Sequence, residues 1–292
     1  MTAALSRAGP ALALTFNAFT WGVSWWPFRE LQALGLHPLW ATALIYAVAV
    51  GVITVWRRGA WGELLRTRSL WPLVLAAGIT NATFNWGVTV GDVVRVVLLF
   101  YLMPLWAVLL ARLLLHEPLT RAAGLRVALA LTGAAIVLWP AAGMGGLPLP
   151  RALPEWLGVL GGFTFALNNV MLRREAAQPE AARALAMFLG GAVVAGGVAI
   201  AFSFDGTVAL PPAPAMGWVL GALALAVAFL AGNLALQYGA ARLPANVTAV
   251  IMITEVLFAA GSAVLLGAGT VTPALALGGA LIVGATLLSG RD

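Results

Sequence analysis

Long stretches without a charged side chain decide what this chain can fold into. Asp, Glu and Arg are absent from residues 8–28, 38–56, 69–91, 96–111, 127–150, 156–172, 184–204 and 206–241. A helix that crosses a membrane needs about 20 mostly apolar residues. Charged residues form 9% of this chain, whereas a soluble domain has about a quarter. The chain therefore cannot build a soluble protein surface, and we predict an all-α membrane protein.

The number of spans follows from where the charge-free stretches break. Residues 206–241 begin with a proline-rich loop and hold one helix, roughly 215–240. Residues 243–290 contain a single charge, Glu255, and break near Gly267 to Pro273, so they hold two helices. This gives ten transmembrane helices joined by loops too short for another domain. The first span lacks a small-residue cleavage pattern and is expected to be retained.

The arginines predict the orientation of these spans. All 16 cationic side chains are arginine. With the N-terminus in the cytoplasm, 13 of them fall in inside segments, and only Arg29, Arg95 and Arg151 fall outside. Cytoplasmic loops carry an excess of positive charge, so we predict that both termini are cytoplasmic. The same placement explains the basic charge without a nucleic-acid partner.

Several kinds of site are disfavoured by composition. The chain has no cysteine, which excludes disulfides and thiolate metal sites. Its two histidines, His37 and His116, lie at the edges of spans, which argues against a histidine metal centre. We find no nucleophile–base arrangement, so we expect neither a cofactor, a metal nor an enzyme.

An internal repeat divides the chain into halves. Residues 81–87 read NATFNWG and residues 233–239 read NLALQYG, at a constant offset of 152. After a one-residue gap, Gly133 corresponds to Gly284. The halves are residues 1–145 and 150–292, with five helices each. An odd number of spans inserts the second half upside down, and inverted repeats recur in secondary transporters.

The segment from Asn85 to Thr120 resembles the EamA-type half of the drug/metabolite transporter superfamily. That half ends its fourth helix with a proline followed by a leucine-x-glutamate turn, here Pro104 and Leu115-His116-Glu117. In the second half, Glu255 stands at the place of Pro104 and Ala268 at that of Glu117. Tyr101-Leu102-Met103-Pro104 and the aromatic-rich helices further resemble the bacterial aromatic amino-acid exporters.

This resemblance implies a fold and a mode of action. It implies ten helices in two inverted repeats within the bacterial inner membrane. It also implies export from the cytoplasm by alternating access, through a central cavity lined by helices 1, 3, 4, 6, 8 and 9.

Polar side chains within the spans are the candidate substrate-binding residues, because such groups usually face a bundle interior or cavity. The alternative is that the amides only hold helices together, or recur because both halves descend from one ancestor. Asn81 and Asn85 lie four residues apart and so share a helix face, as do Asn233 and Gln237. Trp21 and Trp86 could stack on an aromatic substrate. The candidates are Asn17, Thr20, Trp21, Tyr46, Asn81, Asn85, Trp86, Tyr101, Asn168, Asn169, Asn233, Gln237 and Tyr238.

Glu255 is the only acidic residue near the centre of a predicted span. Burying an ionised carboxylate in a membrane is expensive. Glu255 is therefore a candidate for proton coupling or for binding a substrate ammonium. The alternative is a protonated structural glutamate that is hydrogen-bonded to a neighbouring helix.

These features predict an exporter of amino acids, with aromatic and other bulky neutral ones favoured, and of related metabolites. A multidrug exporter of lipophilic cations is the alternative, and an integral-membrane enzyme acting on a lipid-linked substrate is a weaker one. The expected partners are a small-molecule substrate and the lipid bilayer, and a monomer is favoured over an obligate oligomer.

Overall fold

The computed structural model describes residues 2–116, 121–139, 147–240, 242–243, 251–252 and 254–289, and over these residues it is helical without any strand. Glu117 lies outside the described residues, as does the side chain of Gln237. The elements are α1 (Thr2–Val23), α2 (Trp25–Ala33), α3 (Pro38–Trp56), α4 (Gly59–Arg66), the 3-10 helix η1 (Arg68–Leu70), α5 (Trp71–Val90), α6 (Val93–Phe100), α7 (Met103–Leu114), α8 (Arg121–Val137), α9 (Leu153–Arg174), α10 (Glu180–Phe204), α11 (Met216–Ala240), α13 (Thr254–Leu265) and α14 (Pro273–Ser289).

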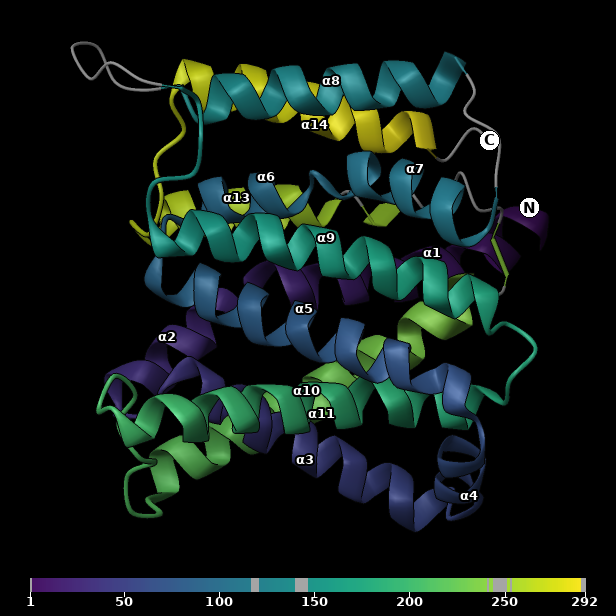
Figure 1. The fold of residues 1–292 in the computed structure, drawn as a ribbon, viewed down its shortest axis with the longest axis vertical. Helices are drawn as coiled ribbons and strands as arrows, with labels where there is room; N and C mark the ends of the chain where they lie inside the picture. The colour runs from purple at the N-terminus through teal and green to yellow at the C-terminus, as the bar shows by residue number, and fades with distance from the viewer. Residues whose placement is uncertain are drawn as a thin grey trace.

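The helices lie roughly along one direction and stack in layers (Figure 1). The pair α8 and α14 forms one end of the stack, and α3 with α4 lies at the other. Between them, α5 packs against both α9 and α10, while α1 packs against α11 and α13. The start of α1 and the end of α14 lie on the same side of the molecule as α4, which we call the α4 side; the opposite side, which carries α2, is the α2 side.

Length and hydropathy suit this bundle to a membrane. Within the described residues, five helical segments are long and apolar enough to cross one, with α6 and α7 taken together as one segment, and three shorter apolar helices accompany them. Large apolar side chains also cover the outside of the bundle; Phe204 is 88% exposed and Leu265 is 85% exposed. A soluble protein rarely exposes apolar surface on this scale. The ten-helix count and the orientation remain predictions.

Helix boundaries follow local backbone chemistry. Pro38 occupies the first position of α3, where its missing N–H costs nothing, and the imidazole of His37 accepts a hydrogen bond from the Leu39 N–H at 3.2 Å. Gly267 has a φ of 68° just after α13, a left-handed conformation that ends helices. Pro273 then begins α14.

Two of the predicted spans are broken into two helices. α1 and α2 separate at Ser24, and α6 and α7 separate at Tyr101 and Leu102. The second break has a clear cause, because Pro104 has no N–H to donate to the carbonyl of Phe100. The α9 helix passes so close to that carbonyl that only glycine fits at position 162.

Glycines allow the closest helix crossings. Gly78 of α5 meets Gly190 of α10 backbone to backbone, and Gly133 of α8 meets Gly278 of α14 in the same way. A Cβ atom on Gly133 would lie 2.6 Å from the Gly278 carbonyl oxygen. Small residues at such crossings are typical of packed membrane helices.

Candidate functional site

A central cavity of about 130 Å³ lies where the helices of the two halves meet. It is lined mainly by apolar and aromatic side chains, with a few amides and one carboxyl. The lining residues are Asn17, Trp21, Tyr46, Ala77, Thr80, Asn81, Phe84, Phe100, Phe165, Asn168, Met187, Phe188, Phe229, Asn233, Leu236, Met252 and Glu255. A mostly apolar cavity with a few placed polar groups is the usual form of a small-molecule site.

Four asparagines, one from each of four helices, define the polar part of this cavity. Asn17 comes from α1, Asn81 from α5, Asn168 from α9 and Asn233 from α11. Asn81 and Asn233 are the pair already matched at offset 152, and Asn17 and Asn168 are related by the nearly identical offset of 151. Residues 1–145 and residues 150–292 thus each supply two asparagines to one cavity.

Asn17 is held by a hydrogen bond between distant parts of the chain. Its side chain is 1% exposed, and its Nδ2 donates to the carbonyl oxygen of Gly232 in α11 at 2.8 Å. A carbonyl can only accept, so this contact fixes which end of the amide is the oxygen. That oxygen, Asn17 Oδ1, is buried and has no hydrogen-bond partner in the described part of the protein.

The other amides differ in how fully they are engaged. Both ends of Asn81 are used, because Nδ2 donates to the Ala77 carbonyl at 2.8 Å and Oδ1 accepts from the Tyr46 hydroxyl. Asn168 is 2% exposed, and its Oδ1, like that of Asn17, finds no partner among the described residues. Unsatisfied buried acceptors are uncommon, and each calls for an explanation.

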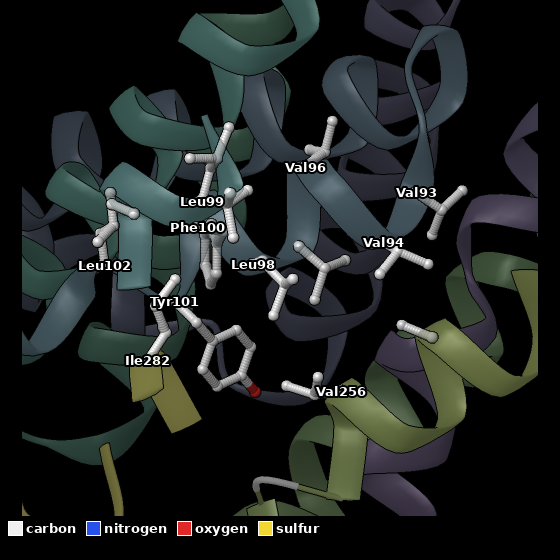
Figure 2. Close-up of a cluster of buried hydrophobic side chains, with 14 of the residues drawn as sticks. Val93, Val94, Val96, Leu98, Leu99, Phe100, Tyr101, Leu102, Val256 and Ile282 are labelled. Carbon is white, nitrogen blue, oxygen red and sulfur yellow. The ribbon is translucent and has the colours of Figure 1, made fainter. Parts of the chain in front are cut away.

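Among the described residues of the cavity lining, Glu255 is the one that carries an acidic group. Its Oε2 accepts a hydrogen bond from the Tyr101 hydroxyl at 3.1 Å. Figure 2 shows this tyrosine ring leaving the break after Phe100 and directing its hydroxyl towards α13, beside Val256. The backbone carbonyl of Glu255 also lies against Gly22, where a Cβ would approach it to 2.7 Å. Glu255 therefore lies between two broken helical segments: it contacts Tyr101 at the break between α6 and α7, and Gly22 close to the break between α1 and α2.

Aromatic rings form the apolar walls. Trp21 stacks on Phe229 with ring centres 4.5 Å apart and planes 15° from parallel. On the other side, the ring of Phe100 packs against those of Phe84 and Phe165, with ring centres 4.7 and 5.2 Å apart. Ring faces carry negative charge density, so such walls suit both apolar groups and organic cations.

The structure gathers some predicted site residues and leaves others outside. The cavity takes in Asn17, Trp21, Tyr46, Asn81, Asn168, Asn233 and Glu255, and Tyr101 reaches it through its bond to Glu255. Thr20 donates to the carbonyl of Phe16 in its own helix. Outside the lining lie Thr20, Asn85, Trp86, Asn169 and Tyr238.

Each of these outside residues has a different environment. Asn85 is fully buried one helical turn from Asn81 and donates to Thr42 in α3 at 3.1 Å. Trp86 packs edge-on against His37 and Phe202. Asn169 is exposed, and Tyr238 is 44% exposed with the guanidinium of Arg242 over its ring.

Sequence reasoning did not single out most of the apolar wall. The lining residues that it missed are Ala77, Thr80, Phe84, Phe100, Phe165, Met187, Phe188, Phe229, Leu236 and Met252. Helical spacing could have found part of this set, since Ala77 and Phe84 lie four before and three after Asn81 on one face of α5. Met187 and Phe188 belong to α10, a helix that was not expected to line the cavity.

Comparison with known proteins identifies the first half. Residues 9–139 match the EamA-like transporter family. Over these residues the chain is similar to that family. The resemblance predicted from Pro104 and the turn after it is thereby confirmed, whereas the finer resemblance to aromatic amino-acid exporters stays a prediction. The match indicates a multi-pass membrane transporter of the drug/metabolite type, and members of this family are transporters rather than enzymes.

Solved structures share the fold of this chain. One crystal structure aligns with 97% of this chain and 96% of its own at 20% sequence identity, with a TM-score of 0.59. At that identity the likeness shows the fold alone. No curated protein matches the sequence.

A second cavity lies next to the first. It has a volume of about 1020 Å³ and lies among α3, α4, α10 and α11. Phe188 and Asn233 line both cavities, so they form the boundary between them. Arg57, Glu63 and Glu180 stand at the end nearest α4. We call this space the α4-side groove.

The α2 side of the same chain is tied together by hydrogen bonds. The guanidinium of Arg29 donates to the carbonyl oxygens of Val88, Thr89 and Gly91 at the end of α5, at 3.3, 3.0 and 2.6 Å. Trp25 donates from its indole to Ser262 of α13 at 2.9 Å. These bonds, which we call the α2 latch, join α2 to α5 and α13.

The described residues include no group of three or more His, Asp or Glu side chains that could hold a metal ion. The described cavity lining offers amides, hydroxyls, aromatic faces and one carboxyl. Such groups bind and orient a small molecule, and they fit the transport role that the family match indicates.

Proposed function

We propose that this protein exports amino acids, with aromatic and other bulky neutral ones favoured, and related metabolites. The observation that carries the proposal is the central cavity, in which four asparagines and Glu255 stand among aromatic rings. Amides and a carboxyl bind an ammonium, while the rings hold a bulky side chain. In the proposal the two halves rock about this site, which alternately opens to each side of the membrane.

An inverted repeat of two five-helix halves, 1–145 and 150–292, supports alternating access. Helix contacts occur in corresponding pairs: α1 packs on α11 and α13, while α9 packs on α5, α6 and α7. The offsets of 151 and 152 that relate the cavity asparagines relate these helices as well. Two near-equivalent halves can exchange conformations, and that exchange opens the site to either side.

We further propose that the protein sits in a bacterial inner membrane as a monomer with both termini in the cytoplasm. The distribution of arginines, 13 on the proposed inner side and 3 on the outer, supports the orientation in this proposal. The α4-side groove then faces the cytoplasm, which suits the uptake of a substrate for export.

Export of lipophilic cations is the second candidate function. The carboxyl of Glu255 and the stacked rings of Trp21 and Phe229 favour it, because both attract a positive charge. Under this candidate Glu255 is essential, and an amino-acid carboxylate is not needed.

Counterflow in proteoliposomes tests the proposal. Vesicles loaded with unlabelled amino acids are given labelled tryptophan, phenylalanine, alanine or lysine outside, with and without an imposed pH gradient. Saturable exchange of the bulky neutral amino acids is expected. If none exchanges while a lipophilic cation does, the amino-acid assignment fails and the second candidate replaces it.

The same assay on Glu255→Gln tests whether Glu255 couples transport to proton movement. We expect the variant to lose the dependence of transport on the pH gradient. Glu30→Gln is the matched control, because Glu30 is an exposed carboxylate that accepts from Trp26 and lies outside the cavity. An unchanged pH dependence in Glu255→Gln would remove Glu255 from the coupling role.

A further inference from the structure

The hydrogen-bond donors and acceptors of the central cavity are unequally used. Asn17 Nδ2 is committed to the Gly232 carbonyl, Asn81 Nδ2 to the Ala77 carbonyl, and the Tyr46 hydroxyl to Asn81 Oδ1. These are donors that a substrate carboxylate would need. The protein thus already uses the Tyr46 hydroxyl proton and one of the two N–H groups of each of these two amides.

The acceptors show the opposite pattern. Asn17 and Asn168 both line the cavity, and their side-chain oxygens are buried and meet no donor within the described ranges. Glu255 adds a carboxyl, of which one oxygen accepts from Tyr101. Arginine does not occur among the described lining residues, and the chain has no lysine. The cavity therefore presents spare acceptors and no fixed cation.

An unsatisfied buried acceptor costs free energy that only a donor restores. Two such oxygens at corresponding positions of the two halves, together with a carboxyl, match the several N–H donors of a protonated amine. A quaternary ammonium has the same charge but no N–H, so it cannot satisfy them. A carboxylate is itself an acceptor and offers them nothing.

We propose that the cavity recognises its substrate through a protonated primary or secondary amine, with Asn17 and Asn168 as the specificity-determining acceptors, and that it does not require a substrate carboxylate. This inference rests on the proposed function in one respect, that the central cavity is the transport site. It deepens that function by extending the substrate class from amino acids to the corresponding amines.

Four ligands that share a phenyl ring and a short carbon chain separate the relevant features. Phenylalanine has both groups, phenethylamine lacks the carboxylate, 3-phenylpropionate lacks the amine, and trimethyl(phenethyl)ammonium lacks the N–H. Their binding to the purified protein is measured by the quenching of tryptophan fluorescence and by thermal stabilisation. We expect phenethylamine to bind at least as well as phenylalanine, the quaternary cation about tenfold more weakly, and phenylpropionate not measurably.

Variants then connect the preference to named oxygens. Asn17→Leu removes the acceptor at nearly constant volume, and we expect it to weaken phenethylamine binding about tenfold and leave the quaternary cation unchanged. Asn85→Leu is the control, because Asn85 Oδ1 is also buried without a partner in the described structure but lies outside the cavity lining. It should leave the ratio of the two affinities as in the unmodified protein.

The outcomes separate this inference from the proposed function. If phenylalanine exchanges in counterflow but phenethylamine neither binds nor exchanges, the inference is overturned while amino-acid export stands. If phenethylamine binds and exchanges but no amino acid does, the inference stands and amino-acid export fails. Equal binding of phenylpropionate and phenethylamine also overturns the inference, and this comparison needs no variant to fold.

Discussion

His37 shows how a single residue ties the stability of this protein to pH. Its Nδ1 accepts the Leu39 N–H at the start of α3, which only the neutral ring can do. Partial burial lowers the pKa of His37 below its ordinary value of 6.5. The unfolded chain therefore binds this proton more readily than the folded one, so the contribution of His37 is present above pH 6.5 and is lost as the pH falls below it.

This predicts a difference between two histidine substitutions. The unfolding temperature in detergent should fall between pH 7 and pH 5, and His37→Asn should reduce that fall, because an asparagine caps the helix without titrating. His116→Asn is the control and should follow the unmodified protein. Identical slopes for His37→Asn and the unmodified protein would contradict the assignment.

The neighbouring residues Asn168 and Asn169 show how much of the site could be predicted from the sequence alone. Successive residues on a helix point about 100° apart, so the two cannot both face one cavity. The sequence does not say which one does, because helix rotation is set by packing with other helices. In the structure Asn168 is buried at the cavity and Asn169 is exposed. Spacing likewise predicted that Asn81 and Asn85 share one helix face. It did not predict the depth at which the cavity begins, and only Asn81 of the two lines it.

Among the elements, α8 carries two glycines that differ only in their surroundings. Gly133 meets the backbone of α14, whereas a Cβ on Gly124 would meet nothing within 4 Å. Gly133→Ala should lower the free energy of unfolding by about 1–3 kcal/mol, because neither backbone can give way. Gly124→Ala should raise it by up to about 1 kcal/mol through higher helix propensity.

Thermal or denaturant unfolding in detergent compares the two alanine variants directly. Since each adds one methyl group to the same helix, the sign of the change separates packing from propensity. A stabilised Gly133→Ala protein would show that the α8–α14 crossing is looser than described.

The boundaries of the elements were largely predictable, and their breaks were not. The charge-free stretch 38–56 is the helix α3, and the break at Gly267 to Pro273 separates α13 from α14, because charges, glycine and proline act locally. The split between α6 and α7 was not predicted, although Pro104 was noted. A proline in a membrane helix either kinks or divides it, depending on which neighbouring groups interact with the carbonyl that has lost its hydrogen bond. Here the freed Phe100 carbonyl lies against Gly162 of α9, too close for a Cβ atom to fit there.

At the scale of the whole molecule, the two sides of the cavity differ in access. The α4-side groove reaches Phe188 and Asn233 at the cavity boundary, whereas the α2 latch joins the helices on the opposite side. Hydrogen bonds to a charged donor such as Arg29 are among the strong ones. We therefore expect a reagent to reach the cavity more readily from the α4 side.

The absence of cysteine from the sequence makes this expectation measurable. Ala77→Cys places one thiol in the cavity lining, and an impermeant maleimide is added to either face of oriented vesicles. Labelling should be faster from the α4 side, and adding Arg29→Ala should raise labelling from the α2 side severalfold. Arg151→Ala, which removes an exposed arginine before α9, is the control. Equal labelling from both faces of the Ala77→Cys protein would contradict the assigned access.

The bond between Tyr101 and Glu255 has a consequence for the resting state of the transporter. In the proposed repeat, the positions corresponding to Tyr101 and Glu255 at an offset of 151 are Met252 and Pro104, which cannot form such a bond. Exchanging the conformations of the halves would therefore exchange unlike contacts. One hydrogen bond of about 1 kcal/mol already favours one state roughly fivefold. Under the proposed alternating access, an empty carrier built this way would spend most of its time facing one compartment, and its unloaded return would differ in rate from its unloaded departure.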